Sequence, residues 1–140
     1  KVGGGTNHRF GLFDMVLIKD NHILVAGSIK AAVNGARKKY PNLKVEVETE
    51  NLDMVKEALE AGADRIMLDN MDNDTMKACT ALRRGTVQFE ASGNMNIDRI
   101  AGVAATGVDS ISVGSLTHSV CTFDFSFQTN YVWVLGRIAR

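Results

Sequence analysis

The chain has 140 residues, enough for one domain with a sizeable core, and 45% of them are hydrophobic. Its 16 basic residues balance its 16 acidic residues, which excludes bulk electrostatic attraction to nucleic acid or to an anionic membrane. No apolar run approaches the roughly 20 residues that a membrane-spanning helix needs. Cys79 and Cys121 favour free thiols in a reducing, cytoplasmic compartment.

Five apolar runs predict β-strands, and helical periodicity occupies most of the intervening sequence. The strands are expected over 13–18, 44–48, 65–69, 86–90 and 110–114. The helices are expected to begin near Ser28, Asn51, Asn73 or Asp74, and Asn96, which are all good capping residues. In the last of these helices, the stripe facing the core would contain Ile97, Ile100, Val103 and Ala104.

The alternation of strands and helices predicts an α/β fold with a parallel sheet. The strands are apolar runs rather than clean alternations, which suits a sheet covered on both faces. Two architectures fit the spacing: a partial, TIM-like (β/α) barrel and a doubly wound sheet. Residues 61–64 and 105–109 also weakly resemble each other, which is consistent with barrel-type repetition.

Polar residues follow every predicted strand at the point where it ends. Parallel barrels place their reactive groups at the carboxyl ends of successive strands, whereas doubly wound sheets concentrate them at one switch point. The spread over all five ends therefore favours the barrel. The strand ends carry the segments 19–22, 48–51, 69–70, 90–94 and 114–118.

Three potential cations flank the first predicted strand. His8 and Arg9 precede it and Lys19 follows it, and together they could converge on an anion, with arginine forming a fork to a carboxylate and lysine supplying a point charge. The alternative is that Arg9 and Lys19 are solvated loop charges.

Glu48 and Asp69 each end a strand. Two carboxylates on neighbouring strand ends suit a Mg²⁺ ion or the hydroxyls of a sugar. The alternatives are a surface salt bridge for Glu48 and a helix-capping role for Asp69.

Two short glycine–serine turns follow the last two strands. Ser92 and Gly93 lie in the first turn, and Gly114 and Ser115 in the second. Backbone N–H groups at such turns bind phosphate, and barrels often carry a phosphate site after their late strands. Plain connecting turns also favour these residues, and the residues alone do not decide the role of His118.

These strings together resemble one known family. Residues 3–22, GGGTNHRFGLFDMVLIKDNH, closely resemble the quinolinate phosphoribosyltransferases, also called carboxylating nicotinate-nucleotide pyrophosphorylases. Later segments resemble the same family in the same order, so that the likeness covers about residues 1–127. These segments are 45–51, 66–71, 89–94 and 113–119.

The resemblance implies a reaction and a role for each candidate residue. Quinolinate and phosphoribosyl pyrophosphate would give nicotinate mononucleotide, pyrophosphate and CO₂ for NAD synthesis, with Mg²⁺ as cofactor. By resemblance, His8, Arg9 and Lys19 bind quinolinate, and Glu48 and Asp69 hold the ribose hydroxyls and the metal-bound cosubstrate. The positions expected around the 5′-phosphate are Ser92, Gly93, Gly114 and Ser115.

The chain also departs from the family pattern. Residues 1–127 would form a partial barrel domain without the family's N-terminal sandwich domain and early barrel, and residues 128–140 form a divergent tail. We therefore expect this polypeptide alone to be incomplete and nearly inactive, and the full-length protein to be a homodimer or homohexamer. Two alternatives stay open: a related phosphoribosyltransferase acting on another substrate, and a non-catalytic phosphate-binding or assembly module.

Overall fold

The computed structural model describes residues 2–128, which contain a five-stranded parallel sheet with the strand order β1-β2-β3-β4-β5. The strands are β1 (Met15–Ile18), β2 (Lys44–Thr49), β3 (Arg65–Asp69), β4 (Gln88–Ser92) and β5 (Ser110–Ile111). The helices are α1 (Asp20–Ala26), α2 (Ile29–Lys39), α3 (Leu52–Glu60), α4 (Asn73–Ala81), α5 (Ile97–Ala104) and α6 (Ser115–His118).

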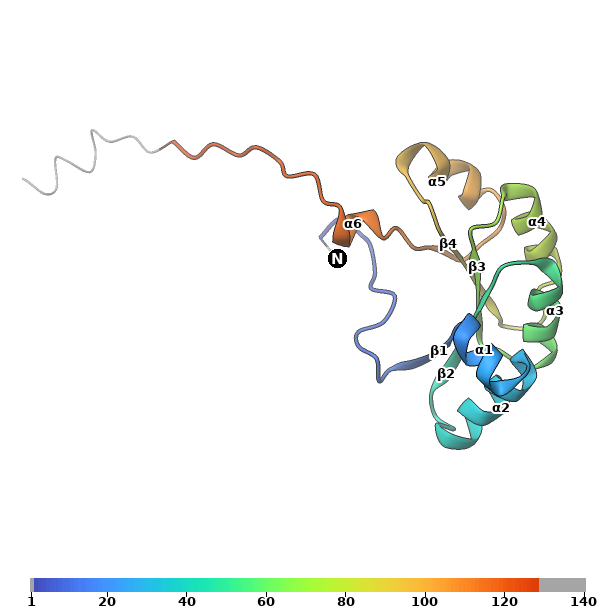
Figure 1. Cartoon of the computed structure of the whole chain (residues 1–140). Coiled ribbons are helices and arrows are strands. Elements are labelled where there is room, and N and C mark those ends of the chain that lie inside the picture. The colour runs from blue at the N-terminus through green and yellow to red at the C-terminus, as the bar shows by residue number, and fades with distance from the viewer. Residues whose placement is uncertain (1, 129–140) are drawn as a thin grey trace, which may run out of the picture.

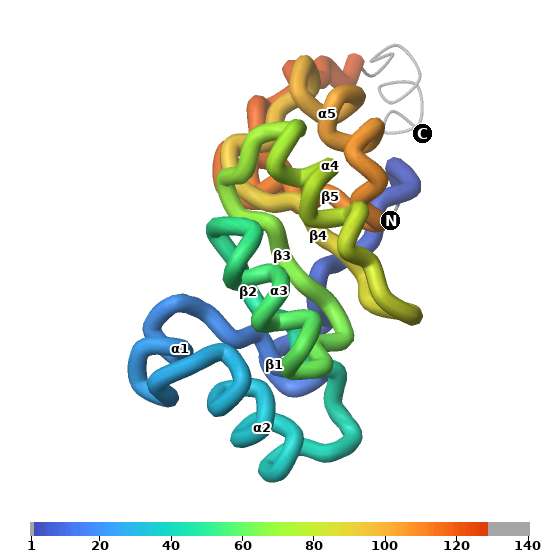
Figure 2. Tube along the Cα trace, turned by 90° about the vertical axis from the view of Figure 1, so that its right-hand side faces the viewer, coloured from blue at the N-terminus to red at the C-terminus, as the bar shows by residue number. Residues whose placement is uncertain are grey.

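Helices α1 to α5 cover one face of this sheet. Figure 1 shows them on one side of the strands, while the N-terminal segment passes on the other side. Figure 2 looks onto the helical layer, in which the helices follow one another in chain order. Sequential parallel pairing with helices on one face is the pattern of a (β/α) barrel, and a doubly wound sheet carries helices on both faces. The predicted α/β partial-barrel fold is confirmed.

The hydrophobic core lies between the sheet and the helices. Alternate strand residues such as Val47, Ile66 and Phe89 are fully buried there and pack with helix residues such as Val55 and Val103. Successive residues of a strand point to opposite faces, so the remaining positions point away from the helices. Those positions carry Glu46, Glu48, Arg65, Asp69 and Glu90.

The expectation of a sheet covered by apolar layers on both faces is therefore wrong. The sequence VEVE over residues 45–48 is an alternation of apolar and acidic residues, and the structure divides it between the two faces. Within residues 2–128, the second face lies opposite the helices and carries these charged residues together with apolar ones such as Met15 and Met67.

Three of the four predicted helix starts are confirmed by their caps. The side chains of Ser28, Asn51 and Asn96 accept the N–H of Ala31, Met54 and Arg99, respectively. The remaining helix, α4, begins at Asn73, but its capping side chain is Asp72, which accepts the N–H of Thr75.

Several boundaries and two helices differ from the expectation, since α6 lies in the segment 114–118 that was predicted as a turn. Strand β4 starts and ends two residues later than predicted, so it includes Ser92, and β5 is shorter than predicted. The sequence did not predict α1, because this helix buries none of its residues and so lacks a core-facing stripe. In α5, Ile97 is 84% exposed and Ala104 is also exposed. The prediction that these two residues face the core is therefore wrong.

Residues 123–127, at the end of the segment that resembles the family, form no strand. Phe123, Phe125 and Phe127 are exposed, and the extended segment leads away from the body of the molecule (Figure 1). A strand needs a neighbour for its backbone hydrogen bonds.

Among the helices of residues 2–128, none has both the length and the apolar character that a membrane span requires. Apart from residue 128, the predicted divergent tail lies outside the described residues.

The edge of the sheet where the strands begin carries two equivalent clamps. Before β3, the carboxylate of Asp64 accepts the Val45 N–H at 2.8 Å and an Arg37 N–H at 3.1 Å. Arg37 also donates to the carbonyl of Gly62. The weak sequence similarity between residues 61–64 and 105–109 therefore has a structural counterpart.

The second clamp repeats every one of these contacts before β5. Asp109 accepts the Phe89 N–H at 2.7 Å and an Arg83 N–H at 2.7 Å, and Arg83 also donates to the carbonyl of Gly107. Although partial burial acts in the opposite direction, the hydrogen bond from Phe89 and the charge of Arg83 lower the pKa of Asp109.

We expect Asp109→Asn to lower the free energy of unfolding by about 1–2 kcal/mol, because it weakens two charge-assisted hydrogen bonds at a partly solvent-screened site. Since native Asp109 binds its proton less tightly than the unfolded group, this advantage is present above the ordinary pKa of 3.8 and is lost as the pH falls through the lower native value. Urea unfolding at several pH values measures both effects. Asp98→Asn, at an exposed acid in the first turn of α5, is the control, and an equal loss in both variants would contradict the clamp.

Candidate functional site

The carboxyl ends of the five strands meet at one edge of the sheet, where most of the predicted site residues lie. Lys19 follows β1, and its ammonium group is 3.3 Å from the carboxylate of Glu48 on β2. Lys19 is the N-cap of α1, and its N–H is accepted by Nδ1 of His22. His22 is therefore a helix-capping residue in this structure, and the salt-bridge alternative for Glu48 is realised.

Asp69 is the last residue of β3 and lies in register with Ser92 on β4. Its carboxylate accepts a hydrogen bond of 2.8 Å from the side chain of Asn70. Because Asp72 caps α4, Asp69 does not have the capping role that was its alternative. Glu48 and Asp69 thus face the same side of neighbouring strands, with carboxylate oxygens of the kind that Mg²⁺ prefers.

The two glycine–serine turns form one pocket of about 440 Å³. The structure brings together all four predicted phosphate residues, although they come from two separate turns. Ser112 lies on the same wall as the second turn, and His118 of α6 also lines the pocket. The lining residues are Ser92, Gly93, Asn94, Met95, Ser112, Gly114, Ser115 and His118.

The first turn of this pocket has a specific backbone shape. Gly93 has φ +88°, and a Cβ added there would lie 2.8 Å from the backbone nitrogen of Asn70. Asn70 and Asn94 also have positive φ, which costs conformational energy in residues other than glycine. Arg99 of α5 ties this first turn to the turn after β3 by donating to the carbonyls of Gly93 and Met71 at 3.2 and 2.6 Å.

The structure does not bring the three predicted cations together. Arg9 donates to the carbonyl of Met15 at 3.3 Å, at the start of β1, whereas Lys19 lies at the other end of that strand. His8 lies over the middle of the sheet on the face opposite the helices. The three cations therefore do not converge in this structure, because Arg9 and Lys19 lie at opposite ends of β1, and their shared ligand stays a prediction.

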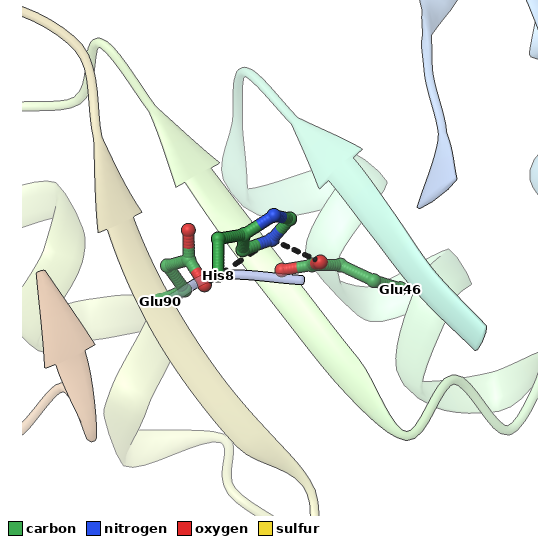
Figure 3. A group of neighbouring side chains, drawn as sticks. All are labelled: His8, Glu46 and Glu90. Atoms are coloured by element: carbon green, nitrogen blue, oxygen red, sulfur yellow. Dashed lines mark hydrogen bonds and ion pairs between the residues drawn. The ribbon is translucent and has the colours of Figure 1, made fainter. Parts of the chain in front are cut away.

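His8 contacts two acidic residues that were not predicted as site residues. Its Nε2 is 2.7 Å from Glu46 on β2 and 3.6 Å from Glu90 on β4 (Figure 3). Glu90 also pairs with Arg65 at 3.1 Å and accepts the hydroxyl of Ser112 at 2.6 Å. The sequence signal that could have identified Glu46 is the alternation in residues 45–48, which places Glu46 beside Glu48 among the residues facing away from the helices.

Both carboxylates of this cluster are almost completely buried. Glu46 is 0% and Glu90 is 1% exposed, whereas the side chain of His8 is 26% exposed. Burial, and after it the negative charge of Glu90, raises the pKa of Glu46 above its ordinary value of 4.5. His8 and Arg65 act in the opposite direction.

The family model for the C-terminal domain of quinolinate phosphoribosyl transferase matches residues 1–128. The chain belongs to this family. A probable carboxylating nicotinate-nucleotide pyrophosphorylase of Bacillus subtilis is 45% identical over 131 residues, covering 91% of this chain and 45% of its own length. One from Synechocystis is 47% identical over 132 residues, with the same coverage of both chains.

Solved structures agree with this membership. The crystal structure of NadC from Streptococcus pyogenes has a TM-score of 0.85 and 43% identity, and the match covers 91% of this chain and 45% of that chain. The nicotinate-nucleotide pyrophosphorylase of Francisella tularensis has a TM-score of 0.79 and 50% identity, covering 82% of this chain and 41% of that chain. The chain thus spans somewhat less than half the length of these relatives.

We expect Gly93→Ala to destabilise the chain by about 1–3 kcal/mol, because the turn requires positive φ and a close approach to Asn70. Thermal unfolding measures this effect. Gly35→Ala is the matched control, since Gly35 lies inside α2 with open space around it. Alanine should stabilise that helix by up to about 1 kcal/mol, and a Gly93→Ala variant as stable as the Gly35→Ala variant would contradict the strained turn.

We expect Glu46→Gln to change how stability depends on pH. Native Glu46 binds its proton more tightly than the unfolded residue, so its stabilising contribution is present below pH 4.5 and is lost as the pH rises through the raised native pKa. The unfolding free energy of the wild type minus that of Glu46→Gln should therefore fall as the pH rises above 4.5. Urea unfolding at a series of pH values tests this, and parallel curves for the two proteins would contradict it.

Proposed function

We propose that this chain forms the substrate-binding barrel part of a quinolinate phosphoribosyltransferase. Such an enzyme transfers a phosphoribosyl group from phosphoribosyl pyrophosphate to quinolinate and releases pyrophosphate and CO₂, giving nicotinate mononucleotide. The observation that carries this proposal is the family match over residues 1–128, combined with one strand-end edge that carries cationic, acidic and glycine–serine groups in turn.

The phosphate end of the site has the clearest support. The pocket between the two turns is lined by small residues, so a ligand can approach backbone groups closely, and serine hydroxyls and His118 supply hydrogen-bond donors. We propose that Ser92, Gly93, Gly114 and Ser115 bind the 5′-phosphate of the phosphoribosyl group. The positive φ of Gly93 supports this role, because nests of backbone N–H groups commonly hold anions.

The acidic part of the edge lies between this pocket and Lys19. We propose that Glu48 and Asp69 bind the ribose hydroxyls and would hold Mg²⁺ together with the cosubstrate. The donor chemistry fits, since both are carboxylates on the same face of neighbouring strands. When bound, Mg²⁺ supplies neutralising charge for the pyrophosphate leaving group.

Quinolinate carries two carboxylates, so its site requires cations. Lys19 lies at this edge, where it pairs with Glu48. His8 lies on the sheet face opposite the helices, in contact with Glu46. We propose that Arg9 also binds a substrate carboxylate, for which its guanidinium would have to leave the Met15 carbonyl at the opposite end of β1. Loss of CO₂ then needs little acid–base assistance, because the pyridinium nitrogen formed by phosphoribosyl transfer stabilises the negative charge at the adjacent ring carbon.

We also propose that the full activity requires the part of such an enzyme that this chain does not match. The chain covers 45% of the Bacillus relative, and the sheet has open edges at β1 and β5 within residues 2–128. Isolated, it is expected to be inactive or nearly so, and the whole protein is proposed to be a homodimer or homohexamer. Free Cys79 and Cys121 support a reducing, cytoplasmic location.

Calorimetric titration with phosphoribosyl pyrophosphate and Mg²⁺, and separately with quinolinate, tests this function. We expect Ser92→Ala and Ser115→Ala each to weaken binding of phosphoribosyl pyrophosphate about 10-fold, since each removes a hydrogen bond to a charged phosphate. Quinolinate binding should stay unchanged in both variants.

Ser126→Ala, in the exposed segment after α6, is the matched control and should bind as the wild type does. Binding of phosphoribosyl pyrophosphate with another pyridine acid but not with quinolinate would favour a related transferase. A chain that binds neither compound would contradict the enzymatic proposal and favour the assembly module.

A further inference from the structure

Two buried acids stand on the sheet face that the helices leave uncovered. Glu46 and Glu90 are almost inaccessible to solvent, and burying a carboxylate costs free energy unless partners compensate it. Glu90 has two such partners, Arg65 and Ser112, in addition to His8. Glu46 depends on His8 much more strongly, because among the described residues its second oxygen, Oε1, is buried without a hydrogen-bond partner.

A retained buried acid with an unsatisfied oxygen needs an explanation. A metal ion bound by His8, Glu46 and Glu90 is one possibility, since these groups offer ligand atoms within 4.8 Å of one another. The position of Arg65 argues against it. Its guanidinium is 3.1 Å from Glu90 and already supplies the positive charge that a metal would bring to this carboxylate.

The geometry around His8 favours a different role. His8 belongs to the irregular segment before β1, and the contact of its Nε2 with Glu46 joins this segment to the sheet. A carboxylate that accepts from Nε2 keeps a hydrogen on that nitrogen and fixes the orientation of the ring, and when the ring is protonated Nδ1 is a donor as well. Figure 3 shows that the other ring nitrogen, Nδ1, points away from both carboxylates.

We propose that Glu46, assisted by Glu90, is a positioning residue that holds the ring of His8 through its Nε2–H, so that the protonated ring donates its Nδ1–H to an anionic ligand. Arg65 keeps Glu90 in place from the neighbouring strand β3. The identification of that ligand as a carboxylate of quinolinate rests on the proposed function. The positioning itself rests on the contacts of Figure 3.

The direct test is the nitrogen and proton NMR signature of the His8 ring in the ¹⁵N-labelled chain. A short hydrogen bond to a buried carboxylate should make the His8 Nε2–H signal visible and shift it downfield. The chain has 3 histidines, and His8→Gln assigns the signal. In Glu46→Gln the downfield signal should be lost or moved upfield, and in Glu46→Leu it should be absent.

Glu60→Gln, at an exposed acid on α3, is the matched control and should leave the signal unchanged. Methyl resonances of the core report whether each variant is folded. If Glu46→Leu does not fold, Glu46→Gln alone tests the proposal, because it keeps the size of the side chain. A downfield signal that is missing from the wild type, or that persists unchanged in folded Glu46→Gln, would overturn the proposal.

A binding experiment links this positioning to the ligand. We expect Glu46→Gln to raise the Kd for quinolinate about 10-fold while leaving the Kd for phosphoribosyl pyrophosphate unchanged. Equal quinolinate affinity in the wild type and in Glu46→Gln would overturn the positioning role. A wild type that binds no quinolinate but shows the Glu46-dependent signal would refute the proposed substrate and support the positioning of His8.

Discussion

Parallel pairing of five strands in chain order is the constraint from which the rest of this structure follows. It places all carboxyl ends of the strands at one edge, and it requires each connection to cross back over the sheet as a helix on the same side. One face thereby becomes the apolar core. The other face receives every second residue of each strand, and here those residues include Glu46, Arg65 and Glu90, whose charges are compensated by one another and by His8.

The two ends of the strands have different tasks. At the edge where the strands begin, Asp64 and Asp109 join neighbouring strands through the same set of backbone and arginine contacts. These contacts stabilise the fold. At the opposite edge, the structure keeps strained asparagines, a positive-φ glycine and a salt bridge accessible to solvent. This division agrees with the general rule for barrels, in which one end maintains the fold and the other carries the chemistry.

Membership of the quinolinate phosphoribosyl transferase family supports the roles that we propose for this edge, and the chain matches less than half the length of the Bacillus relative. The pocket of the two glycine–serine turns is already formed within the described residues. The three predicted cations do not form a comparable site, because Lys19 pairs with Glu48 and Arg9 donates to a backbone carbonyl. The pocket that we propose for phosphate is therefore formed in this structure, whereas the side chains that we propose for carboxylate binding would have to rearrange.

The sequence by itself determined the α/β fold, the positions of four helices with three of their caps, and the presence of polar groups at the strand ends. These features depend on local periodicity and on capping chemistry, which neighbouring residues encode. It did not predict α1, because a helix with no buried residue has no core-facing pattern. The tertiary structure alone decided that Gly93 and Gly114 share one pocket, that Arg9 and Lys19 lie at opposite ends of β1, and that His8 meets Glu46. These contacts join residues far apart in the chain, and they arise when parallel pairing brings separate strands into register and places the segment before β1 over the sheet face opposite the helices.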